Sequence, residues 1–194
     1  MRLYLKIGLA LAAVAAPLHA QDSVDPAASV FANPLKGDYA AQSSACREGP
    51  MAAFGRYLGS YDFQDAQIAA DGSWTEGKGG QWDFFCLGEG IAVQDFWQPN
   101  AGGYGATMRM YNAETDAWDI VFTGEGSQAM SHLSGTLQDD GTLVMYYITP
   151  TLEGIERRIT FSPPTEAGFD WMLSISRDGR KSWVDVYRMT ATRR

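Results

Sequence analysis

The sequence has few of the residues that enzymes use for metal binding and nucleophilic catalysis. Its 194 residues include two cysteines and two histidines, and His19 lies in the N-terminal apolar region. No G-x-S-x-G, H-E-x-x-H or glycine-rich phosphate-binding motif occurs. These absences exclude the corresponding hydrolase, metalloprotease and nucleotide sites, and we expect no bound metal and no cofactor.

Positive charge is scarce as well. Lysine and arginine total 15 against 23 aspartate and glutamate residues, which gives a formal net charge of −8. Such a chain repels the phosphates of nucleic acids and the surfaces of anionic membranes. We therefore expect no nucleic-acid partner. A small uncharged or cationic molecule fits better, although acidity also serves solubility alone.

Long apolar segments are missing after the first twenty residues. Before that point, Arg2 and Lys6 precede an apolar run over 7–16, and small residues lead to Ala20. This pattern predicts a bacterial secretory signal peptide over residues 1–20 and a periplasmic or secreted mature protein. The run is too short to span a membrane, and we expect no membrane insertion. Cleavage removes two positive charges and changes the formal charge from −8 to −10.

Two cysteines, Cys46 and Cys86, remain in the mature chain. In an oxidising compartment a lone pair of this kind is expected to form a disulfide, and the alternative is two unconnected buried thiols. Residues 21–44 are rich in Ala, Asp, Ser and Pro, and we expect a flexible leader over 21–47. Residues 48–194 are enough for one domain with a sizeable core. Nothing in the sequence predicts an oligomeric state.

Short alternating segments separated by turn residues dominate the chain after a predicted helix over Pro50–Leu58. Turn signals such as Asp71-Gly72 and Asp140-Gly141 separate them. Many strands in sequential order predict an all-β, antiparallel up-and-down barrel of 8–10 strands, because closure removes exposed edges. A sandwich is the alternative. The predicted strands cover 59–69, 79–87, 90–98, 103–111, 117–123, 127–138, 142–149, 154–162, 168–176 and 182–190.

The segment 90–98 carries a carboxylate among its inward-facing residues. Asp95 shares the alternating row of Ile91, Val93 and Trp97, which should face a core. A carboxylate in that row marks the end of the strand, belongs to a structural ion pair, or is a polar group that lines a ligand cavity. An unpartnered buried charge is expensive, so the second and third readings require a partner.

The pairing of neighbouring strands supplies that partner. If Trp97 lies opposite Gly105 and Tyr111 lies opposite Trp118, Asp95 and Arg109 become diagonal neighbours on one face, roughly 7–8 Å apart. A slip of one residue would separate them. The predicted face is apolar and aromatic apart from this pair, and carries Ile91, Val93, Asp95, Trp97, Thr107, Arg109, Tyr111, Trp118, Ile120 and Phe122.

This face suggests a ligand cavity as well as a structural ion pair. Ligand sites combine mostly apolar walls with a few convergent polar groups. The expected ligand-binding residues are Asp95, Trp97, Arg109, Tyr111, Trp118 and Phe122. A barrel that binds a ligand here should contain a cavity of roughly 300 Å³ or more that reaches Trp97 and Trp118. A solid core would exclude ligand binding in the barrel.

Two alternative functions are compatible with the same residues. In a cofactor-independent isomerase, hydratase or lyase, Asp95 would act as general acid or base, with Arg109 or His132 stabilising charge. Burial of Asp95 entirely against Arg109 would argue against this role. His132 is the single residue that suggests haem binding, and a solvent-facing or hydrogen-bonded strand histidine is the more common explanation of such a residue.

A turn near the C-terminus has its own signature. Ser176 to Trp183 resembles the Asp-box turn of sialidase-type propellers, with Arg180 where a second glycine is usual. A propeller would repeat this turn, and it occurs once here. We expect Asp178 and Ser176 to brace a hairpin through bonds from side chain to backbone.

Several motifs together resemble a known family. Leu58-Gly59-Ser60-Tyr61 resembles the G-x-W signature of lipocalin and calycin barrels, with tyrosine in place of tryptophan. The order of motifs across 51–192 is similar to a bacterial family of lipocalin-like secreted domains with no established general activity. The resemblance implies a calycin-type barrel with an interior cavity, and a cation at Arg188 packed over Tyr61. The leading expectation is a module that binds a small hydrophobic or aromatic molecule.

Overall fold

The computed structural model describes residues 45–194, and the predicted signal peptide and most of the predicted leader lie outside them. The described part contains a short 3₁₀ helix, one α-helix and eleven strands. Their bounds are η1 (Ala45–Arg47), α3 (Ala52–Gly55), β1 (Gly59–Ile68), β2 (Trp74–Glu76), β3 (Gly80–Leu87), β4 (Ala92–Pro99), β5 (Gly105–Asn112), β6 (Ala117–Gly124), β7 (Ser131–Leu137), β8 (Leu143–Thr149), β9 (Glu156–Phe161), β10 (Gly168–Ser176) and β11 (Val184–Arg193).

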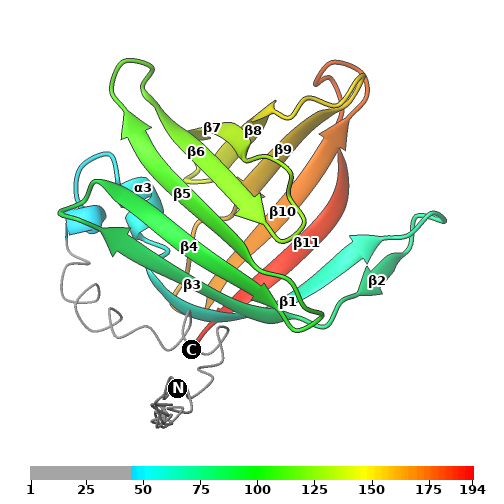
Figure 1. Ribbon diagram of the computed structural model, residues 1–194, viewed down its shortest axis with the longest axis horizontal. Helices are drawn as coiled ribbons and strands as arrows, with labels where there is room; N and C mark the ends of the chain where they lie inside the picture. Colours follow the sequence, from blue (N-terminus) through cyan, green and yellow to red (C-terminus); the bar gives the residue numbers. More distant parts are fainter. Residues whose placement is uncertain (1–44) are drawn as a thin grey trace, which may run out of the picture. The chain divides into compact units, whose positions relative to one another are not determined.

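The strands form a closed antiparallel barrel. Each strand from β3 to β11 pairs with its neighbour in sequence, β3 pairs with β1, and β11 returns to pair with β1. Figure 1 shows β1 and β11 side by side, where the first and last strands of the barrel pair. The predicted up-and-down barrel is confirmed with ten strands, and the sandwich alternative is wrong.

Every predicted strand is present; the strand predicted over 168–176 has the predicted ends, and the others begin or end at different residues. The strand predicted from residue 90 begins at Ala92, and Ile91 is 63% exposed, so its place on the inward face was wrong. The turn through Gly90 takes up the residues before Ala92. The short strand β2 was not predicted. It pairs with the end of β1 outside the barrel ring, and Trp74 is its single large apolar residue.

Helix α3 covers one end of the barrel, here named the helix end. The ring of Phe54 meets Trp118 edge-on at 5.6 Å, and Tyr57 meets Phe161 at 5.3 Å. Both helix-end tyrosines, Tyr57 and Tyr61, are fully buried. Aromatic burial of this size is a large part of the apolar area that stabilises the fold, so the helix closes the barrel as a hydrophobic plug.

The predicted disulfide is present and ties the start of the described chain to the barrel. Cys46 in η1 and Cys86 in β3 are bonded, with their Cα atoms 5.7 Å apart. Both residues are buried. The bond therefore holds η1 against β3, next to the helix end.

The cation over the first aromatic residue is a different arginine from the expected one. Arg193 lies over Tyr61, with its guanidinium carbon 4.8 Å from the ring centroid. The predicted Arg188 lies over Trp74 instead. The pairing of Tyr61 with Arg193 and of Ala66 with Arg188 explains the difference, since residues 188 and 193 point to opposite faces of β11.

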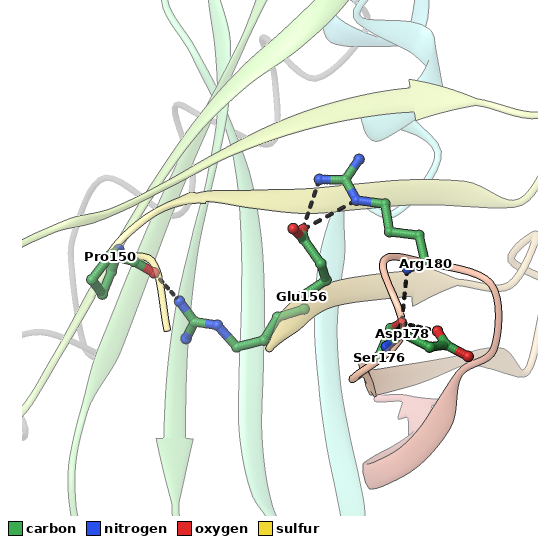
Figure 2. Close-up of polar contacts among 6 residues, drawn as sticks. Pro150, Glu156, Ser176, Asp178 and Arg180 are labelled. Carbon is green, nitrogen blue, oxygen red and sulfur yellow. Dashed lines mark hydrogen bonds and ion pairs between the residues drawn. The ribbon is translucent and has the colours of Figure 1, made fainter. Parts of the chain in front are cut away.

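The turn between β10 and β11 is braced as predicted. Ser182 and Lys181 donate their backbone N–H groups to Asp178, and Arg180 donates its own to Ser176. Figure 2 shows Ser176, Asp178 and Arg180 of this turn, with the side chain of Arg180, which reaches Glu156 at 2.9 Å. The signature is therefore a hairpin brace in this protein.

A candidate ligand cavity in the barrel

The strand register brings the predicted charge pair together. Trp97 lies opposite Gly105, and Tyr111 opposite Trp118, as the sequence predicted. Within that register Arg109 Nη2 donates to Asp95 Oδ2 over 2.5 Å, and both side chains are at least 98% buried. A charge-assisted bond of this length is among the stronger contacts in a protein. The pair is thus a real feature of the barrel interior.

The pair satisfies only part of its hydrogen-bonding capacity. Within the described residues, Asp95 Oδ1 and the Nε and Nη1 atoms of Arg109 are buried without a partner. Three rings surround the guanidinium carbon, those of Phe54 at 5.2 Å, Phe84 at 5.5 Å and Phe161 at 5.7 Å. Ring faces attract the cation but offer no lone pair to its N–H groups. The remaining polar atoms therefore need a partner of another kind.

A cavity of about 130 Å³ adjoins the pair. Its wall holds one charge of each sign, and the other lining residues are mainly aromatic and aliphatic. The lining residues are Asp95, Arg109 and Thr107, the rings of Trp82, Trp97, Phe122, Tyr147, Phe161, Trp171 and Tyr187, and the aliphatic and thioether side chains of Ile120, Leu133, Met145, Ile159 and Met189.

The cavity differs from the expected one in two respects. Its volume is less than half of the expected 300 Å³, which limits the size of any occupant. Tyr111 and Trp118 are not among its lining residues. Tyr111 donates its hydroxyl to Asp116, and Trp118 packs on Phe54 at the helix end. Of the six expected ligand-binding residues, Asp95, Trp97, Arg109 and Phe122 line the cavity.

A glycine makes room for two of the lining rings. A Cβ atom at Gly105 would lie 2.9 Å from the ring of Phe122 and 3.2 Å from that of Trp97. The absence of a side chain at this position lets both rings occupy the space over β5. Gly105 thereby shapes the cavity although it contributes no side chain to it.

Several lining residues come from strands outside the predicted aromatic face. Trp82 from β3, Tyr147 from β8 and Trp171 and Tyr187 from the last two strands line the cavity. Their signal in the sequence is alternation alone, which marks an inward face but not which inward positions meet.

Two of the lining tyrosines are held in the neutral form. Burial raises the pKa of Tyr147, against the opposing charge of Arg157, which lies 3.9 Å over its ring. Burial also raises the pKa of Tyr187, and its hydrogen bond to Asp65 adds to the effect. Tyr187 donates to Asp65 Oδ2 over 2.8 Å, so its hydroxyl proton is already used.

His132 does not join this site. Its side chain is exposed on β7, and it does not line the cavity. It can act neither as an interior haem ligand nor as a partner of Asp95. In residues 45–194 no cluster of three or more His, Cys, Asp and Glu residues has the arrangement of a metal site. No helix in the same range has the length and apolar character needed to cross a bilayer.

Comparisons with known proteins identify the fold. No protein-family model matches the sequence, and no curated protein sequence matches it. Among solved structures, the chain is similar to the S-type phycobiliprotein lyase CPES from Guillardia theta, with a TM-score of 0.50 and 12% identity over 80% of this chain and 97% of that one. It also matches Rv2717c from M. tuberculosis, with a TM-score of 0.47 and 11% identity over 76% of this chain and 98% of that one.

The likeness to the lyase structure, with the closed ten-stranded topology and the short helix, defines a lipocalin-like, calycin-type β-barrel fold. At 12% identity the likeness extends to the fold alone. The site must be judged from its own residues.

Proposed function

We propose that the barrel binds a small apolar or aromatic molecule in its interior cavity. The observation that carries the proposal is a 130 Å³ cavity walled by aromatic rings and one buried ion pair. Interior sites of this composition hold a ligand by apolar contact and orient it with a few polar groups. The rings of Trp97, Phe122 and Trp171 are half-buried, which supports access from the end of the barrel opposite the helix.

The cavity volume sets the size of the ligand. An apolar cavity of about 150 Å³ accommodates benzene. A cavity of 130 Å³ therefore suits a molecule with one aromatic ring and few substituents.

The acid–base alternative has less support. A general base must be able to take up a proton, and Asp95 is instead bonded to Arg109 at 2.5 Å in a buried pair. The opposite charge beside it favours a fixed structural and orienting role.

Export of the protein remains part of this proposal. The Cys46–Cys86 bond supports folding in an oxidising compartment. N-terminal sequencing of the mature protein should begin at Gln21, and an unprocessed N-terminus after expression in a bacterial host would contradict export.

A cavity-filling variant tests the binding proposal. Leu133 lines the cavity and Leu137 lies on the same strand, 45% exposed and outside the cavity. Leu133→Phe should remove binding of small aromatic molecules, measured by calorimetry, while Leu137→Phe should leave it unchanged. Equal binding by both variants would place the ligand elsewhere. Thermal unfolding of each variant shows whether the added ring has disturbed the fold.

A further inference from the structure

The unpartnered polar atoms of the cavity wall define the chemistry of its occupant. Besides the Nε and Nη1 atoms of Arg109, the indole Nε1 atoms of Trp82 and Trp97 are buried without a hydrogen-bond partner in the described residues. All of these residues line the cavity. An indole nitrogen only donates, and a guanidinium only donates.

Donors therefore outnumber acceptors around the cavity. Among the unpartnered buried atoms of the wall, four nitrogens are donors and Asp95 Oδ1 is the acceptor. Leaving a buried donor unpaired is costly. An occupant that relieves this cost has to present oxygen or nitrogen lone pairs rather than N–H or O–H groups.

The charge of the wall limits the occupant further. Asp95 and Arg109 are the lining residues that carry formal charge at neutral pH, and they neutralise each other at 2.5 Å. An anionic ligand would add an uncompensated charge to a buried neutral pair, at a large desolvation cost. A ligand with a carboxylate group would supply lone pairs, but its negative charge would be uncompensated in this cavity.

From these observations we infer that the ligand is an uncharged aromatic carbonyl compound with a single ring, such as a small aryl ketone or aldehyde. This inference rests on the proposed binding function and specifies its ligand class. The carbonyl oxygen accepts from the donors of Arg109 and from an indole N–H group. The ring lies against the aromatic wall, which includes Trp97, stacked in turn on Phe63 with their centroids 5.9 Å apart.

Three probe molecules of similar size separate the effect of the carbonyl acceptor from those of molecular shape and charge. Acetophenone carries a neutral acceptor, ethylbenzene has the same shape without an acceptor, and benzoate is an anionic acceptor at pH 7. We expect the mature, disulfide-bonded protein to bind acetophenone at least about tenfold more tightly than either of the others, since hydrogen bonds to a charged group are worth that much or more. Titrations by isothermal calorimetry measure the three dissociation constants.

The tryptophan indole signals report where the carbonyl binds. In proton–nitrogen NMR spectra, the N–H signals of Trp82 and Trp97 should move on addition of acetophenone. Trp118 is the matched control, because its Nε1 is also buried without a partner but its side chain does not line the cavity. Trp97→Phe should weaken acetophenone binding by about three- to tenfold, the value of one hydrogen bond, whereas Trp118→Phe should change it less than about twofold.

A double variant tests the role of the ion pair without leaving a lone buried charge. Asp95→Leu combined with Arg109→Met replaces the pair by apolar side chains, a change that such sites often tolerate. We expect this protein to remain folded, to keep its affinity for ethylbenzene and to lose its preference for acetophenone.

The outcomes distinguish this inference from the binding function on which it rests. Equal affinity for acetophenone and ethylbenzene would overturn the carbonyl assignment and leave the apolar binding site in place. Tighter binding of benzoate would also overturn it, in favour of an anion. Failure of all three probes to bind would overturn both the ligand class and the cavity as a binding site.

Discussion

Arg193 and Tyr61 join the last strand of the barrel to the first. The guanidinium carbon of Arg193 lies 4.8 Å from the centroid of the tyrosine ring, and its Nη2 donates to the hydroxyl over 2.6 Å. Arg193 Nη1 also donates to the carbonyl of Leu58. One side chain thus links β11, β1 and the segment that follows α3, at the seam where the barrel closes.

The first prediction concerns this seam. Arg193→Ala should lower the free energy of unfolding by about 1–2 kcal/mol, through the lost hydrogen bonds and cation–π contact. Arg188→Ala is the matched control, because Arg188 is 46% exposed and pairs with the exposed Glu76. Its loss should cost less than about 1 kcal/mol. Urea denaturation measures both values, and equal losses would contradict the seam role of Arg193.

The second prediction concerns the buried pair. Asp95→Leu alone and Arg109→Met alone should each destabilise the protein by about 3–5 kcal/mol, because each leaves an uncompensated charge in the interior. The double variant should come within about 1–2 kcal/mol of the wild-type protein. Chemical denaturation of the four proteins gives a complete double-mutant cycle. Single variants as stable as the wild type would mean that water reaches the pair.

The third prediction concerns the disulfide. Cys46 and Cys86 are 40 residues apart, and a loop of this length corresponds to roughly 3–4 kcal/mol in the chain-entropy description. The double variant Cys46→Ala/Cys86→Ala should lose about that much unfolding free energy. Its stability should not respond to dithiothreitol, whereas the wild-type protein should fall to a similar level when reduced. A wild type whose stability is unchanged by full reduction would contradict the prediction.

The fourth prediction concerns alkaline pH. Burial raises the pKa of Tyr57 from 10.0 to about 12, so the unfolded chain loses this proton at lower pH than the folded protein. The associated stability is complete below pH 10 and is lost as pH rises towards 12, and it amounts to about 3 kcal/mol.

Tyr57→Phe tests this linkage. The variant should be less stable by about 1 kcal/mol at neutral pH, because the hydrogen bond to Ser162 is lost. Between pH 10 and 11.5 its unfolding free energy should fall less steeply than that of the wild type. Some slope should remain, since the pKa of Tyr187 is also raised. Identical slopes for the two proteins would contradict the assignment to Tyr57.

Much of the local site followed from the sequence because strand pairing obeys short-range rules. Alternation marked the inward row of Val93, Asp95 and Trp97, and short connections limited the registers of neighbouring strands. The pairing of Trp97 with Gly105 and of Tyr111 with Trp118 was correct as a result. Adjacent strands were sufficient to find the partner of Asp95.

The position of each inward-facing side chain along the barrel axis could not be predicted from the same rules. Trp118 and Trp97 both point inward, yet Trp118 packs against the helix end and Trp97 lines the cavity. The position of α3 decides this difference, because Phe54 occupies the space beside Trp118. The alternation of apolar and polar residues along a strand does not predict which inward residues a helix distant in sequence will cover.

The sequence by itself determined an antiparallel barrel and the approach of Asp95 to Arg109, since these depend on alternation, turns and contacts between successive strands. The disulfide followed from the presence of two cysteines in a chain with a predicted signal peptide. The tertiary structure alone decided that Arg193 packs on Tyr61, that rings from both halves of the barrel enclose one cavity, and that this cavity is small. These features arise from closure between the first and last strands and from the filling of a shared interior, where side-chain volume decides which atoms meet.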